Sequence, residues 1–373
     1  MKLQLTSLLL ISFLLCATRT PNVFAQNPAD QDDEVIRVET DLTNLFFTAN
    51  NKQKAFITTL REEDLRIIED GVPQKILTFQ RETDRPLAMA FLIDVSASEE
   101  RTLPQEKAAA RAFIEAIIKS SKDQAAIIPF THAAFLEQAL TRDVLSIYSA
   151  LERVEVASPG YLGSGRPISG IASGPGMRAL GREGSTAIWD AVVLASSEVL
   201  ARNSDPRVTG QQTQGRQGLG SAQSQKSQAQ APNQRRNAII LLTDGQDTSS
   251  RLLRSEAIDR ALQAETVIYA IGIGDKKFGG VDRDELSAVA TATGGRAFFP
   301  KKETDLKTAF AEIEQELRSQ YLIAYSSTNK NRDGSYRQMR IEVTNPELQK
   351  EPLHFRHRPG YFAKPQTEPK RER

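Results

Sequence analysis

Continuous apolar segments of strand length recur through the middle of the chain and alternate with segments of helical periodicity. The apolar segments are 87–93, 125–130, 238–242 and 267–271. The segments whose apolar residues recur with helical spacing are 104–118, 143–154, 186–202, 254–265 and 304–317. Strands that are apolar throughout are typical of a parallel sheet covered on both faces, and their alternation with helices is typical of βαβ units. We therefore predict an α/β domain over 86–317, built on a doubly wound, mainly parallel sheet.

The segment before this domain, 34–85, carries the shorter patterns of a small β module. Two strand-like runs, 65–69 and 75–79, stand on either side of Asp70 and Gly71. An Asp-Gly pair between two such runs is typical of a β-hairpin. We therefore predict that these two runs pair with each other.

The segment after the domain, 318–363, returns to strands. The runs 321–325 and 337–343 stand on either side of a second hairpin-like turn at 331–334, and 353–356 is a last candidate strand. Neither this segment nor the N-terminal β module has enough strands to bury a sheet face by itself. We therefore predict that the two join as one β-sandwich, with the α/β domain inserted between them.

Four stretches of the chain are too polar to contribute to a core. We expect 26–33 to be a flexible leader and 364–373 a charged tail. Two insertions interrupt the α/β domain: 157–184 is rich in Gly, Ser and Pro, and 204–236 holds nine glutamines. The second insertion cannot bury enough apolar surface to offset its ordering entropy, so we expect it to be disordered.

The first 25 residues have the pattern of a secretory signal. Lys2 precedes the apolar run 8–17, and small residues stand before a cleavage site that we place after Ala25. The run is too short for a stable membrane anchor, and no later run is long and apolar enough to span a bilayer. We therefore expect export to the periplasm or the extracellular space; the alternative is a buried N-terminal helix.

Composition excludes several classes of function. The 373 residues include 48 Lys and Arg against 47 Asp and Glu, a formal charge of +1 that does not favour nucleic acid or anionic lipid as a partner. The one cysteine, Cys16, excludes an intrachain disulfide framework and a Cys zinc site. With 39% hydrophobic and 25% charged residues, the chain is neither disordered nor collagen-like.

The residues with metal-binding chemistry follow two of the predicted strands. Asp94, Ser96 and Ser98 come at the end of the first strand, Asp244 follows the strand 238–242, and Thr186 opens a helix between them. Ligands of an open parallel sheet bind beyond the carboxyl ends of its strands, so we expect these side chains in one crevice. Carboxylate and hydroxyl oxygens suit Mg²⁺, Mn²⁺ or Ca²⁺ and are poor ligands for Zn²⁺ or Cu²⁺.

These motifs resemble the metal-ion-dependent adhesion site of von Willebrand factor type A domains. The resemblance lies in Asp94-x-Ser96-x-Ser98, in Gly184-x-Thr186 and in Leu242-Thr243-Asp244-Gly245. It extends to 267–274 and 286–296, which resemble the fifth strand of such domains and the turn into the sixth. It covers roughly 86–317, and the flanking segments resemble a secreted bacterial subfamily of these proteins.

The resemblance implies a role for each of five residues. Ser96, Ser98 and Thr186 would contact the metal, while Asp94 and Asp244 would act directly or through water. One coordination position would stay open for an acidic side chain of a protein partner. The resemblance thus predicts a secreted or periplasmic binding protein, and not an enzyme, that adheres to its partner through the metal.

Other interpretations of the same residues remain. Ser98 and Thr186 are also typical helix N-caps, and 243–245 is also a plain turn. A hydrolase of phosphates or esters would use the same cation, although Asp94-x-Ser96 lacks the second aspartate of the Asp-x-Asp phosphatase pattern. A third interpretation is a scaffold with a vestigial metal site.

Two further aspartates lie close to the site in sequence. Asp190 and Asp247 are candidates for supporting the metal ligands or, equally, for solvated surface charges. Trp189, on the helix after Thr186, is expected in the core.

Overall fold

The computed structural model describes a large part of the chain. The described residues are 42–81, 85–118, 122–157, 166–167, 185–201, 235–244, 246–274 and 280–364. The predicted signal, the leader, most of both insertions and nearly all of the C-terminal tail lie outside them. Among the described residues, no helix is both long and apolar enough to cross a membrane.

A six-stranded sheet forms the centre of the predicted α/β domain. Its strand order is β12-β11-β10-β5-β6-β8, and all neighbouring pairs are parallel except β6 and β8. The strands are β5 (Leu87–Asp94), β6 (Gln124–Phe130), β8 (Gln138–Thr141), β10 (Arg236–Thr243), β11 (Thr266–Gly272) and β12 (Ala297–Phe298). β5 and β10 are buried along their whole length, as their apolar sequences predict. The doubly wound, mainly parallel sheet is therefore confirmed.

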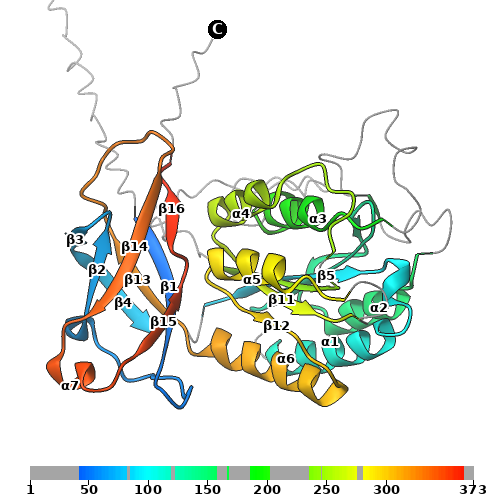
Figure 1. Ribbon diagram of the computed structural model, residues 1–373, viewed down its shortest axis with the longest axis horizontal. Coiled ribbons are helices and arrows are strands. Elements are labelled where there is room, and N and C mark those ends of the chain that lie inside the picture. The colour runs from blue at the N-terminus through cyan, green and yellow to red at the C-terminus, as the bar shows by residue number, and fades with distance from the viewer. Residues whose placement is uncertain are drawn as a thin grey trace, which may run out of the picture. The chain divides into compact units, whose positions relative to one another are not determined.

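Helices cover both faces of this sheet (Figure 1). One face carries α1 (Leu103–Ile117), α2 (Val144–Arg153) and α6 (Glu303–Arg318). The other carries α3 (Ile188–Leu194), the π-helical segment η4 (Ala195–Leu200), α4 (Arg254–Gln263) and α5 (Arg283–Ala292). Trp189 is 5% exposed within the second layer, so its expected place in the core is confirmed.

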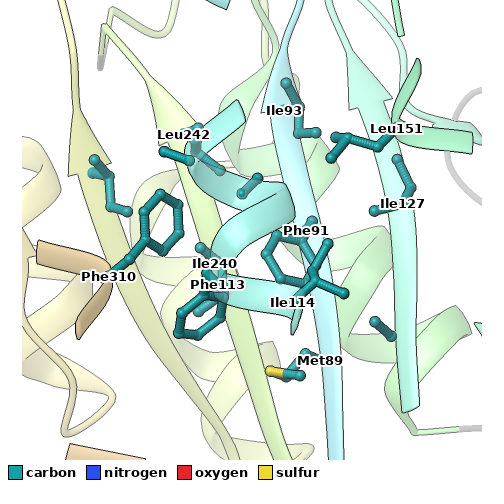
Figure 2. Close-up of a cluster of buried hydrophobic side chains, with 14 of the residues drawn as sticks. Met89, Phe91, Ile93, Phe113, Ile114, Ile127, Leu151, Ile240, Leu242 and Phe310 are labelled. Atoms are coloured by element: carbon teal, nitrogen blue, oxygen red, sulfur yellow. The ribbon is translucent and has the colours of Figure 1, made fainter. Parts of the chain in front are cut away.

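Aromatic packing fixes α1 against the two central strands. Figure 2 shows Phe113 and Ile114 of this helix among side chains of β5 and β10. The Phe113 ring lies 5.9 Å from the ring of Phe91 on β5 and 5.0 Å from the ring of Phe310 on α6. Burying each such side chain contributes about 2–3 kcal/mol, so the strand ends that hold the site rest on a well-packed layer.

Several elements of the domain were not predicted as they occur. The segment predicted as one helix over 186–202 begins at Ile188 and changes to π-helical bonding at Ala195. Helix α5 was not predicted. The short strands β7 (Phe135–Leu136) and β9 (Arg166–Pro167), which pair with each other, and β8 were also missed. All three strands have too few residues to show a period.

The N- and C-terminal segments together build two four-stranded antiparallel sheets. Their strand orders are β15-β1-β13-β4 and β16-β14-β2-β3. The N-terminal strands are β1 (Thr43–Asn50), β2 (Leu65–Glu69), β3 (Val72–Gln74) and β4 (Ile76–Arg81); the C-terminal ones are β13 (Tyr321–Tyr325), β14 (Tyr336–Val343), β15 (His354–His357) and β16 (Gly360–Phe362). Phe47 and Tyr321 of one sheet share a core with Ile67 and Ile341 of the other. The predicted joint β-sandwich is therefore confirmed.

Both predicted hairpins are wrong in their partners. Asp70 (φ 47°) and Gly71 (φ 82°) form a tight turn, but the strand that returns along β2 is the three-residue β3. The run that begins at Ile76 crosses instead to the other sheet and pairs with β13. In the same way, β13 and β14 lie in different sheets although a turn connects them. A short helix, α7 (Pro346–Gln349), and a 3₁₀ turn, η1 (Glu62–Asp64), complete these segments.

Arg358, between β15 and β16, joins the sandwich to the α/β domain. Its guanidinium donates to the backbone oxygen of Asn44 on β1 at 2.7 Å and to that of Leu262 on α4 at 3.4 Å. The carboxylate of Glu265 lies 3.8 Å away. One partly buried cation therefore donates to carbonyl groups of both parts.

Candidate metal centre

The register of the sheet brings the two predicted aspartates together. Ile93 of β5 pairs with Leu242 of β10, so Asp94, the last residue of β5, lies level with Thr243. The Thr243 hydroxyl donates to Asp94 Oδ2 at 2.6 Å. Asp244 follows directly, and oxygens of the Asp94 and Asp244 carboxylates lie within 4.8 Å of each other. The structure thus groups these two side chains at the carboxyl ends of adjacent parallel strands, as the sequence predicts.

The turn after β5 brings two hydroxyls to the same place. The backbone N–H of Ser96 donates to Asp94 Oδ1 at 3.0 Å, which folds the chain back on the carboxylate. The Ser96 and Ser98 hydroxyl oxygens lie 2.9 Å apart. The short helix η2 (Ala97–Glu99) contains Ser98, and α1 has Thr102 as its N-cap. The alternative that Ser98 caps the following helix is therefore wrong.

Thr186 lies at the same edge of the sheet. Its N–H donates to the Thr248 hydroxyl at 2.8 Å, and its carbonyl accepts from the N–H groups of Thr248 and Ser249. The next N–H, that of Ala187, donates to the carbonyl of Thr131 just beyond β6. The N-cap of α3 is Ala187, so Thr186 is not the cap of this helix either.

Asp190 and Asp247 hold the Thr186 segment against the chain that follows Asp244. Asp247 Oδ1 accepts from the N–H of Ile188 at 2.8 Å and from the Ser250 hydroxyl at 2.5 Å. Asp190 Oδ1 accepts from the N–H groups of Arg251 and Leu252 at 3.1 and 3.0 Å. Both carboxylates thus position backbone around the site and are not simply solvated charges.

Two glutamates at the site were not predicted from the sequence. Glu99 contributes an oxygen to the group that Asp94 and Asp244 form, within the same 4.8 Å limit. Glu106 lies on α1, and both glutamates are 1% exposed. The available signal was the position of Glu106 three and seven residues before Ala109 and Phe113, on the apolar face of its helix.

Burial of these carboxylates at one place dominates the electrostatics. Desolvation raises the pKa of Asp94 to about 6, although hydrogen bonds from Thr243 and Ser96 act in the opposite direction. Desolvation, with repulsion from Glu106 and Asp94, raises the pKa of Glu99 well above its ordinary value. Desolvation likewise raises the pKa of Glu106.

The donor set fits a divalent cation. In the described part of the chain, no cationic side chain pairs with the four carboxylates, and the two glutamates have only the Thr102 hydroxyl and each other as hydrogen-bond partners. Buried acids of this kind are costly unless they are paired or hold a metal. All the grouped ligand atoms are oxygens, which favours Mg²⁺, Mn²⁺ or Ca²⁺.

Residues 195–312 match the family model of the von Willebrand factor type A domain. The chain carries a von Willebrand factor type A domain. The matched residues include β10, β11 and Asp244, while Asp94, Ser96, Ser98 and Thr186 precede them on the same sheet or at its edge. Domains of this family bind a divalent metal at the metal-ion-dependent adhesion site, the site that the five predicted residues resemble.

Solved structures with the same type of domain are similar to this chain. Proximal thread matrix protein 1 from the mussel byssus, with zinc in its adhesion-site motif, is 18% identical, with a TM-score of 0.43 over 67% of this chain and 50% of that one. BatB from Bacteroides thetaiotaomicron is 16% identical, with a TM-score of 0.39 over 62% and 98%. A von Willebrand factor type A protein from Catenulispora acidiphila is 13% identical, with a TM-score of 0.43 over 86% and 72%.

The chain therefore spans about half the length of the mussel protein. A comparison with curated proteins finds no match.

Proposed function

We propose that this chain is an exported binding protein whose von Willebrand factor type A domain recognises an acidic side chain of a protein partner through a divalent cation. The observation that carries the proposal is the buried group of carboxylates where β5 and β10 end. The ion would be held by Asp94, Ser96, Ser98, Thr186 and Asp244.

The chemistry of these ligands suits recognition. Two carboxylates balance the charge of a divalent ion, while the three hydroxyls are neutral and leave the ion electrophilic. A carboxylate of the partner would complete the coordination shell. Because the ligands are all oxygens, Mg²⁺ is the proposed ion, with Mn²⁺ and Ca²⁺ as substitutes.

Export and the absence of catalysis belong to the same proposal. The predicted signal at 1–25 supports a periplasmic or extracellular location. We assign the site no enzymatic step, and panels of phosphate and ester substrates supplied with Mg²⁺ or Mn²⁺ test this directly. Metal-dependent turnover that Asp244→Ala abolishes would favour the hydrolase instead.

Calorimetric titration of Mg²⁺ and Mn²⁺ into the full chain tests the metal site. We expect saturable binding that Asp244→Ala abolishes and that Glu351→Ala, a matched loss of an exposed acid, leaves unchanged. Equal binding by the wild type and Asp244→Ala would disprove the assignment of the site.

Acetate, the simplest carboxylate, tests the open position. In calorimetric titration, acetate should bind saturably to the Mn²⁺-loaded protein and not to the metal-free protein. Equal binding of acetate with and without Mn²⁺ would contradict recognition through the metal.

A further inference from the structure

Glu99 lies in the group of carboxylates although it is outside the five-residue motif. It directly follows Ser98 and ends the short helix η2, which turns the chain back over the end of β5. One of its carboxylate oxygens lies within 4.8 Å of oxygens from both Asp94 and Asp244. The side chain is therefore within the span of a single coordination sphere.

A second observation points to a ligand beside Glu99. Glu99 is 1% exposed. The Thr102 hydroxyl donates to its Oε2, while its Oε1 is buried without a hydrogen-bond donor. Glu106 is equally buried, and beside its oxygens lie only the Thr102 hydroxyl and the carboxyl group of Glu99 itself. Two neighbouring buried glutamates thus have fewer donors than their oxygens require.

The same chain shows how it satisfies a buried glutamate that has only a structural role. Glu69, in the sandwich, is 2% exposed. It accepts hydrogen bonds from the hydroxyls of Tyr325, Ser327 and Tyr361, and Arg337 lies 3.5 Å from it. The described residues around Glu99 supply the Thr102 hydroxyl and the carboxyl group of Glu106, and no cation.

We propose that Glu99 is a third carboxylate ligand of the cation held by Asp94 and Asp244. Three carboxylates give the centre a net charge of −1, so the ion is retained without a carboxylate from the partner. The partner's acidic side chain then enters by displacing Glu99, which makes Glu99 an internal competitor for the recognition position. This inference rests on the proposed function, because it concerns the same ion.

Substitution of Glu99 by glutamine separates coordination from packing. Glu99→Gln keeps the size of the side chain and the acceptor for Thr102 but removes the charge. We expect it to weaken Mn²⁺ binding to the full chain by roughly tenfold or more, in calorimetric titration. Glu100→Gln, which removes the exposed acid next in sequence, should leave the affinity unchanged within about twofold.

Hydration of the bound ion gives an independent measurement. Loss of Glu99 as a ligand should admit water, so Mn²⁺ bound to Glu99→Gln should relax water protons more strongly than Mn²⁺ bound to the wild type. Acetate should then bind the loaded variant more tightly than the loaded wild type.

Two further variants keep the test decisive. Glu106→Gln removes a buried charge beside Glu99 and should weaken Mn²⁺ binding less than Glu99→Gln does. Glu99→Asp keeps the charge but shortens the side chain, and it should weaken binding even if Glu99→Gln does not fold. Equal losses in Glu99→Gln and Glu106→Gln, or unchanged affinity and hydration in Glu99→Gln, would overturn the inference. Absence of Mn²⁺ binding in the wild type and in Glu100→Gln would instead overturn the proposed function.

Discussion

Buried carboxylates at the candidate metal centre lower the stability of the metal-free protein. Asp94 is fully buried, accepts from Thr243 and Ser96, and still has its pKa raised by desolvation. The nearby charge of Asp244 adds repulsion. Without a cation, the ionised form of this group is a cost that the rest of the fold has to offset.

The variant Asp94→Asn should therefore be more stable than the wild type when no metal is present. We expect a gain of about 1–3 kcal/mol in the free energy of unfolding at pH 8 with a chelator, because a buried charge is removed. Addition of Mn²⁺ should stabilise the wild type and leave the variant unchanged. Urea unfolding monitored by circular dichroism measures both effects, and a variant less stable than the wild type under chelation would contradict the argument.

His357 should make the stability of the protein depend on pH. Burial lowers the pKa of this imidazole, and the adjacent Arg358 charge acts in the same direction. As the pH falls below the ordinary histidine value, the unfolded chain takes up a proton more readily than the folded one, so stability falls. Between pH 8 and pH 5, the wild type should lose more stability in urea unfolding than His357→Gln does.

The exposed histidine of the same strand provides the control. His354→Gln should keep the pH dependence of the wild type. If His357→Gln and the wild type lose stability in parallel, protonation of His357 does not contribute.

Sequence could identify the site residues that form a motif but not those that only the fold brings in. The alternate spacing at the end of one predicted strand identifies Asp94, Ser96 and Ser98, and the position after another predicted strand identifies Asp244. Glu106 lies in the first turn of α1, after the short helix η2, and its burial depends on how α1 packs. Periodicity places it on the apolar face, yet a lone acid there carries no chemistry until a second buried acid lies beside it.

At the scale of elements, strands were predictable and their pairing was not. The runs 65–69 and 321–325 are strands as predicted. Which strands pair with them depends on the sandwich, because β4 and β13 gain a buried face only by leaving their sequence neighbours for the other sheet. The residue types at Asp70 and Gly71 determine the turn. They do not determine that the strand returning along β2 is only the three-residue β3.

The turn between α5 and β12 should tolerate no side chain at Gly295. A Cβ there would lie 2.0 Å from the backbone oxygen of Ile268 on β11, which cannot move without breaking the sheet. We expect Gly295→Ala to lower the free energy of unfolding by about 2–3 kcal/mol, measured by urea unfolding.

Gly334→Ala is the matched comparison, because its Cβ would meet nothing within 4 Å although its φ is +73°. It should cost only about 1 kcal/mol, the price of the left-handed backbone. Equal losses in the two variants would contradict the argument, because Gly295 has no left-handed backbone and only the contact with β11 distinguishes it.

At the scale of the whole molecule, the chain closes the sandwich around an inserted domain. β1 pairs with β13 and with β15, so strands more than 270 residues apart in sequence complete one sheet. The long insertion lies in sequence between η4, which ends at Leu200, and β10, which starts at Arg236. Asp244 follows the other end of β10.

Deletion of 206–234 should therefore leave the metal centre intact. The deleted residues connect the start of β10 to its preceding helix, and the ligands lie beyond the other end of the strand. We expect the Mn²⁺ affinity to stay within about twofold of the wild type in calorimetric titration, as for a change that does not touch the ligands. Loss of Mn²⁺ binding in a deletion variant that still unfolds cooperatively would refute this placement of the insertion.

Arg358 should make the sandwich and the α/β domain unfold together. Its guanidinium is the donor to the Asn44 carbonyl of β1 and to the Leu262 carbonyl of α4, so its loss leaves carbonyl groups of both parts without a charged donor. We expect Arg358→Met to lower the free energy of unfolding by about 1–3 kcal/mol. Calorimetry should show one transition for the wild type and a broadened or divided one for the variant, because the two cores then melt independently.

Arg340→Met is the control: Arg340 is exposed and pairs only with Glu342 at the surface among the described residues, an interaction worth about 0–1 kcal/mol. A single, unshifted transition in Arg358→Met would mean that packing alone couples the two parts.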